Sequence, residues 1–149
     1  MKLTSLAFDN GSIIPSKYGY NHGNISPPLT IENIPDDTKS LVLIMDDPDA
    51  LRAVGKVWTH WVLWNISPDC KFINENTIPE NSIEGKNDFE EIAYGGPAPP
   101  DKEHRYVFKL YALKSILTNP KGSTKQDIEK SMKDQILFKT ELHGKYSPQ

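Results

Sequence analysis

The apolar residues of this chain occur in short runs or at every second position, and turn residues separate them, a pattern typical of β-strands. Residues 40–45 (SLVLIM) are almost all apolar and end at the polar sequence DDPD. A strand covered on both faces has this composition, so we predict a buried central strand that ends in a turn. Residues 57–66 (VWTHWVLWNI) are rich in β-branched and aromatic side chains and stop before Ser67 and Pro68, which predicts a second strand.

Residues 104–113 (HRYVFKLYAL) predict a third long strand, in which successive side chains point to opposite faces. One face carries His104, Tyr106, Phe108 and Leu110. The other face carries Arg105, Val107, Lys109 and Tyr111. Residues 29–34 have an imperfect period of two, and residues 137–146 predict a weaker last strand. The fold class expected from this pattern is mostly β.

One amphipathic helix is predicted within residues 123–136 (STKQDIEKSMKDQI). Ser123 and Gln126 have the three-residue spacing of a capping box, in which each side chain bonds to the backbone of the other. Ile128, Met132 and Ile136 follow at intervals of four and form one apolar stripe. We therefore expect a helix that packs on a sheet, and a helix that binds a partner's groove is the less favoured alternative.

Residues 69–100 form a long irregular stretch that ends in the sequence YGGPAPP. A loop of that length in a compact domain usually has a function. The chain has neither an internal repeat nor a low-complexity tract or linker, so we expect residues 1–149 to form a single domain.

Composition excludes some classes of function. The net charge is −3, no stripe of basic residues stands out, and Arg52 and Arg105 are the only arginines, which argues against nucleic-acid binding. Cys70 is the only cysteine and cannot form an internal disulfide, as is usual in a reducing compartment. The N-terminal sequence lacks the apolar region of a signal peptide, and no apolar run approaches the roughly 20 residues that span a bilayer. We therefore expect a cytoplasmic protein without a membrane span.

Polar side chains that could do chemistry lie at the ends of the most apolar strands. Asp47 and Asp49 follow the first predicted strand, and His60 lies near the start of the next. His104 and Tyr106 begin the third predicted strand, directly after a loop whose glycines allow close approach to a ligand and whose prolines stiffen its wall. Each feature alone is more simply explained as a core histidine or a polar turn. Their clustering at strand ends favours a pocket.

Three sequence blocks together resemble the phosphatidylethanolamine-binding protein family, and in particular its small prokaryotic, Raf-kinase-inhibitor-like branch. The blocks are DPDA, THWVLWN and YGGPAPPDKEHRYVFKLYAL, which occur in the order and with the spacing of that family. Leu51 stands where the family usually has proline, so we expect a less rigid turn after DPDA. The resemblance covers most of the chain.

The resemblance implies an antiparallel β-sandwich or Greek-key-like core with flanking helices, and one anion pocket at the end of a sheet. The residues carried over to a ligand-binding role are Asp47, Asp49, His60, Gly96, Pro99, Pro100, His104 and Tyr106. In family members such a pocket takes phosphate-like or carboxylate-like groups, including a phosphoryl ethanolamine head group. Two imidazoles and a phenol can donate hydrogen bonds to such an anion, so we expect binding to weaken as pH rises through the histidine pKa values. Asp47 would pair with an imidazole or receive the ligand's ammonium group.

The function expected from this resemblance is a non-catalytic binding or inhibitory protein. Its partner would be a target protein, a protease such as a serine protease or a kinase-pathway protein, and it would need no cofactor and no metal. A homodimer is one of the oligomeric states left open. One alternative is a small hydrolase that uses Asp47, His60 or His104 as its base, although a nucleophile elbow of the G-x-S-x-G type is absent. Another is a metal protein, because histidine and aspartate suit zinc.

Overall fold

The structure is a computed structural model that describes residues 1–149. Two antiparallel sheets face each other, as the predicted mostly β fold class requires. The larger sheet has the strand order β6 (Ile83–Glu84), β4 (Trp58–Ile66), β3 (Ser40–Asp47), β7 (His104–Leu113) and β8 (Ile136–Tyr146). The smaller sheet has the order β1 (Lys2–Thr4), β2 (Leu29–Glu32) and β5 (Phe72–Ile73). The helical elements are η1 (Ser16–Tyr18), α1 (Ala50–Val54) and α2 (Lys125–Met132).

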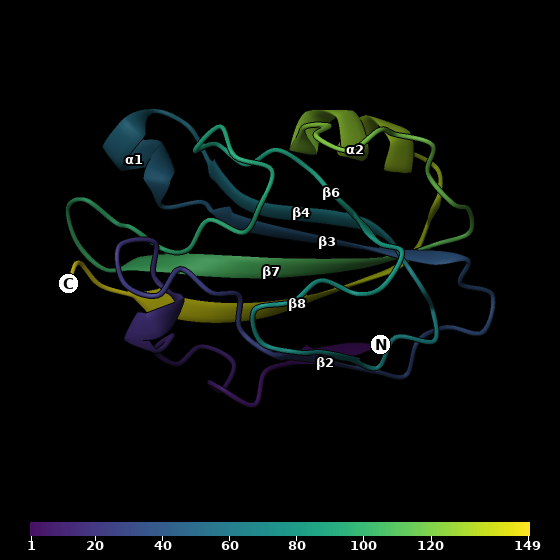
Figure 1. Ribbon diagram of the computed structural model, residues 1–149, viewed down its shortest axis with the longest axis horizontal. Helices are drawn as coiled ribbons and strands as arrows, with labels where there is room; N and C mark the ends of the chain where they lie inside the picture. Colours follow the sequence, from purple (N-terminus) through teal and green to yellow (C-terminus); the bar gives the residue numbers. More distant parts are fainter.

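Strand β3 lies at the centre of the larger sheet, and all eight of its residues are buried. It separates two hydrophobic cores. The larger core fills the space between the two sheets, and the smaller core lies between the larger sheet and α2. Figure 1 shows this layering, with α2 on one side of the larger sheet and β2 on the other. The unbroken apolar sequence of β3 follows from this position, because both of its faces are covered.

Strand β7 has the two faces that its sequence predicts. Phe108 and Leu110 pack in the larger core, whereas Tyr111 packs in the smaller core beneath α2. His104 and Tyr106 continue the first of these faces toward the beginning of the strand, where α1 and the preceding loop approach it (Figure 1). The second half of β7 therefore packs in the core, and its first half places His104 and Tyr106 at the end of the sheet.

Strand β4 departs from the predicted alternation. Strict alternation along residues 57–66 predicts that His60 shares a strand face with Trp58, Val62 and Trp64. The strand register skips His60, because Trp61 lies opposite Met45 and Thr59 lies opposite Asp46. This β-bulge adds one residue to β4 and reverses the alternation on one side of it. Trp58 lines the same cavity as His60, but Val62 and Trp64 pack in the smaller core on the opposite face.

Helix α2 begins one residue later than the sequence suggests. The Thr124 side chain accepts from the Asp127 backbone N–H at 3.2 Å, and the Asp127 side chain accepts from the Thr124 N–H at 3.0 Å. The predicted cap, Ser123, instead donates its hydroxyl to the carbonyl of Pro120. Ile128 and Met132 are buried as expected, but Ile136 is 46% exposed because the helix has ended and β8 has begun.

The predicted irregular stretch contains two short strands, β5 and β6, each of two residues. From sequence alone, residues 50–57 (ALRAVGKV) suggest an exposed loop, but Ala50–Val54 form α1, which ends at Gly55 with φ of 83°. A left-handed residue after a helix is best supplied by glycine. None of the helices has the length and apolar character needed to cross a membrane.

Candidate functional site

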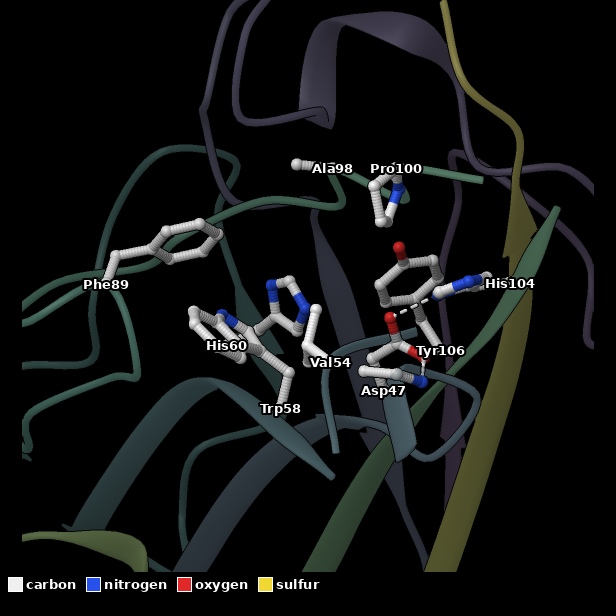
Figure 2. A pocket seen from close by; sticks show the side chains of 10 residues that line it. Asp47, Val54, Trp58, His60, Phe89, Ala98, Pro100, His104 and Tyr106 are labelled. Atoms are coloured by element: carbon white, nitrogen blue, oxygen red, sulfur yellow. Dashed lines mark hydrogen bonds and ion pairs between the residues drawn. The ribbon is translucent and has the colours of Figure 1, made fainter. Parts of the chain in front are cut away.

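A pocket of about 220 Å³ lies where β3 ends and where β4 and β7 begin. Helix α1 and the loop before β7 form its rim. Its lining consists of Asp47, Ala50, Val54, Trp58, His60, Phe89, Ala98, Pro100, His104 and Tyr106. Figure 2 shows the side chains of Asp47, His60 and Tyr106 converging from three neighbouring strands. Five of the predicted site residues thus meet in one cavity, Asp47, His60, Pro100, His104 and Tyr106.

His60 is held to the loop before β7 by two hydrogen bonds. Its Nδ1 lies 2.7 Å from the carbonyl oxygen of Gly95, and the N–H of Gly95 donates to the carbonyl of His60 at 2.9 Å. A carbonyl can only accept, so Nδ1 carries the proton. Burial lowers the pKa of His60 despite the nearby carboxylates, so the ring is neutral and its Nε2 is an acceptor. The ring also packs edge-on against Tyr106 and Phe89.

His104 lies between two carboxylates. Its Nδ1 is 2.7 Å from Oδ2 of Asp47, and its Nε2 is 2.7 Å from Oδ1 of Asp101. Burial alone would lower the pKa of His104, but the hydrogen bonds to Asp47 and Asp101 outweigh it and raise the pKa. Both ring nitrogens donate to carboxylates, which is the arrangement of an imidazolium. His104 therefore has no free N–H with which to bind a ligand.

Asp47 is fixed by two hydrogen bonds at the end of β3. One carboxylate oxygen accepts from His104, and the other accepts from the backbone N–H of Ala50 at 3.0 Å, at the start of α1. The side chain of Asp47 is only 4% exposed. Its charge is therefore matched by that of His104 rather than by water.

Two donors of the pocket have no partner. The hydroxyl of Tyr106 and the indole Nε1 of Trp58 are both buried and lack any hydrogen bond. Figure 2 shows the Tyr106 hydroxyl pointing toward Pro100 at the rim. Burial and then the charge of Asp47 raise the pKa of Tyr106, so its phenol keeps the proton and remains a donor. An unpaired buried donor costs about 1–3 kcal/mol, which a ligand with an acceptor would recover.

Three predicted site residues lie beside the pocket rather than in its lining. Asp49 accepts from the backbone N–H of Arg105 at 2.8 Å and so joins the turn after β3 to the start of β7. Gly96 donates its N–H to the side chain of Asn24, and a Cβ at this position would collide with the backbone at Tyr18. Pro99 lines a neighbouring cavity, and Pro100 lines both. These residues shape the rim.

Sequence reasoning missed two polar residues of the site, Trp58 and Asp101. It also missed four apolar residues of the lining, which are Ala50, Val54, Phe89 and Ala98. In the sequence, Trp58 is an aromatic strand residue two positions before His60. The lack of a partner for its N–H follows from tertiary packing, which the sequence does not show. Asp101 lies in a loop three residues before His104, where spacing fixes no geometry. No group of three His, Cys, Asp or Glu side chains is placed to hold a metal ion.

Comparison with known proteins identifies the family. The family model described as phosphatidylethanolamine-binding protein matches residues 4–147. The chain is 43% identical to a protein of Methanothermobacter thermautotrophicus, described as UPF0098 protein, over 98% of both chains. It is 40% identical to a protein of Chlamydia trachomatis with the same description, again over 98% of both chains.

Two solved structures share the fold over almost their full length. One is a homolog of phosphatidylethanolamine-binding protein from Chlamydia trachomatis, with a TM-score of 0.91, 40% identity, and coverage of 99% of this chain and 97% of the other. The other is Escherichia coli YbcL, described as a member of the mammalian family, with a TM-score of 0.92, 27% identity, and coverage of 99% and 98%. Family model, relatives and structures agree, and the chain belongs to the phosphatidylethanolamine-binding protein family.

Proposed function

We propose that the protein binds a small ligand that presents anionic oxygen atoms, a phosphoryl or carboxylate group, in the pocket between Asp47 and Phe89. The observation that carries this proposal is the pair of unpaired donors at Tyr106 and Trp58. Donors without acceptors define the missing chemistry, and oxygen atoms with several lone pairs satisfy both of them.

The walls of the pocket favour a ligand with a carbon portion beside the oxygen group. Ala50, Val54, Phe89 and Ala98 contribute apolar surface around the donors. The volume of about 220 Å³ is below the roughly 300–1,000 Å³ typical of sites for drug-sized ligands. A head group of a few heavy atoms fits this volume better than a complete phospholipid does.

The charges of the site also define how an anion would bind. The charge of Asp47 is compensated by His104, and His60 is neutral. Binding therefore relies on neutral donors next to a compensated ion pair, in place of the two free cationic imidazoles that the sequence suggested. The lining contains no Ser, Thr, Cys or Lys side chain, and both oxygens of the Asp47 carboxylate already accept hydrogen bonds, which favours binding over covalent turnover.

Calorimetric titration with inorganic phosphate and with phosphoethanolamine tests this proposal. We expect binding by the parent protein, and a loss of about tenfold in affinity for Tyr106→Phe and for Trp58→Phe, because each removes one donor. Tyr111→Phe is the matched control, since Tyr111 lies on the opposite face of β7 in the smaller core. Absence of binding to the parent at millimolar concentration, or unchanged affinity in both pocket variants, would contradict the proposal.

We further propose that a ligand-bound or free pocket rim inhibits a target protein, a serine protease or a kinase-pathway protein. Leu51 and Val54 on α1 are 57% and 50% exposed at the rim, which offers apolar surface for docking. His60 is 2% exposed and cannot itself touch a partner. In a panel of chymotrypsin-like and subtilisin-like proteases, we expect inhibition by the parent and by His60→Ala, and weaker inhibition by Leu51→Ser. No inhibition of any protease at micromolar concentration would leave kinase-pathway proteins as the targets to test.

A further inference from the structure

A chain of three ionisable side chains runs from the surface to the pocket. Asp101 lies on the loop before β7, and its side chain is 44% exposed. The next side chain is His104, which has no exposed surface. The last is Asp47, at the pocket, whose side chain is 4% exposed. Both links are 2.7 Å long, and they use opposite nitrogens of the imidazole. The exposed carboxylate therefore touches the ring on the side away from Asp47.

The surroundings of His104 leave the two carboxylates as its charged neighbours. Tyr106 stacks near it on β7, and Tyr146 is its cross-strand partner on β8. Burial raises the pKa of both phenols, so both are uncharged near neutral pH. Asp47 arrives from β3 and Asp101 from the loop. Asp101 is thus the one anion that acts on His104 without also facing the ligand.

We propose that Asp101 is a positioning residue that acts through His104: it holds the imidazole as a cation, and this cation cancels the charge of Asp47 beside the bound anion. This inference rests on the proposed anion-binding function and names what tunes that site. Opposite charge within hydrogen-bond distance favours the charged form of a histidine, whereas burial opposes it. If Asp101 lost its charge, only Asp47 would stabilise the charged form of the buried imidazole against the cost of its burial.

The consequence for ligand binding follows from the charges. When His104 loses its proton, Asp47 keeps its negative charge and repels the ligand's oxygen atoms. Anion affinity is therefore present while His104 is charged and is lost as pH rises through its raised pKa. Removing the charge of Asp101 would move this loss to lower pH.

The variant Asp101→Asn tests the proposal, with Glu103→Gln as the matched control. Asparagine keeps the size and the acceptor oxygen but removes the charge. Glu103 is an exposed carboxylate two residues further on, and it accepts a hydrogen bond from Ser147, not from His104. Both variants change the net charge of the protein by the same amount. Only one of them should change the site.

The first measurement is the NMR titration of the His104 ring without ligand. We expect a lower titration midpoint in Asp101→Asn and an unchanged midpoint in Glu103→Gln. The second is calorimetry with inorganic phosphate as a function of pH. At a pH above both ring midpoints, we expect the phosphate affinity of Asp101→Asn to be about tenfold weaker than that of the parent for each unit by which its midpoint is lower. The two proteins should bind equally at a pH low enough to charge His104 in both.

The outcomes separate this inference from the proposed function. An unchanged His104 midpoint in Asp101→Asn would overturn the inference whatever phosphate does. A lower midpoint with unchanged phosphate affinity would overturn the link to the pocket and leave anion binding standing. If none of the three proteins bound phosphate, the proposed function would fail with that link, and the ring titration alone would report the hold of Asp101 on His104.

Discussion

Asp46 and Asp47 are neighbours on β3, yet they lie on opposite faces of the sheet and in opposite electrostatic settings. Asp46 is buried beneath α2, where Oδ2 meets Lys109 at 3.1 Å and Lys125 at 2.8 Å. Asp47 faces the pocket and meets His104. Lysine stays charged across the physiological pH range, whereas histidine can change its charge there. Asp46 therefore joins α2 to the sheet at any physiological pH, whereas the charge of the Asp47–His104 pair can change with pH.

The largest expected effect is a loss of stability when the Asp46 carboxylate is removed. Asp46→Ala leaves Lys109 and Lys125, which are 24% and 12% exposed, without their shared anion. Removing one partner of a buried ion pair costs about 3 kcal/mol or more, so we expect that loss in the free energy of unfolding. Chemical denaturation measures it. Phosphate affinity of the folded variant should match the parent, and a loss of affinity would show that the two faces are coupled.

A substitution of Asp47 should change phosphate affinity more than it changes the stability of the fold. In Asp47→Asn the amide oxygen can still accept from Ala50, but the charge that repels an anion is gone. We expect the unfolding free energy to fall by about 2 kcal/mol, as for one hydrogen bond to a charged group. Phosphate affinity should exceed that of the parent most strongly at a pH where His104 is neutral, because the parent then has the Asp47 charge without a matching cation. Calorimetry at several pH values compares the two proteins, and equal affinities at every pH would mean that another group controls binding.

A smaller change probes how α2 is held over Asp46. Thr124→Ala removes the side chain that caps the helix, which should lower the unfolding free energy by about 1 kcal/mol. Ser123→Ala, one residue earlier, removes only a bond to the Pro120 carbonyl and serves as the control. Thermal or chemical denaturation compares the two. An equal loss in both variants would contradict the assignment of Thr124 as the cap.

The smallest expected effect is the pH dependence of stability. The folded state raises the pKa of His104, so its contribution to stability is fully present below the unfolded pKa and is lost as pH rises through the folded one. His60 acts in the opposite sense, because its lowered pKa makes folding less favourable as pH falls through the unfolded value. Unfolding curves should therefore show that His104→Gln loses less stability than the parent as pH rises above about 6.5, the ordinary histidine pKa. An identical slope in both proteins would argue against a charged His104.

The long strands could be predicted from sequence because their signals are local. The apolar run of β3 covers residues 41–45, and the two-faced pattern of β7 extends over ten residues. Strands β5 and β6 have two residues each, too few to display a period. The resemblance to a known family then supplied five pocket residues that the structure brings together.

The features that escaped prediction depend on contacts between distant segments. The bulge at His60 is defined by the register with β3, and no residue type in β4 predicts it. Both Ser123 and Thr124 are residue types that cap helices, and the bond of Ser123 to Pro120 decides between them. Asp101 gains its meaning only when the loop places it against the far side of His104.

The bulge in β4 also gives the protein three optical reporters in three environments. All three tryptophans lie on this one strand, but Trp58 lines the pocket, Trp61 is buried in the larger core and Trp64 is buried in the smaller core. A ligand that accepts the indole N–H of Trp58 would change the fluorescence of that residue and leave the emission of the other two as an internal reference. Single-tryptophan variants would then read pocket occupancy, the packing between the sheets and the packing under α2 as separate signals.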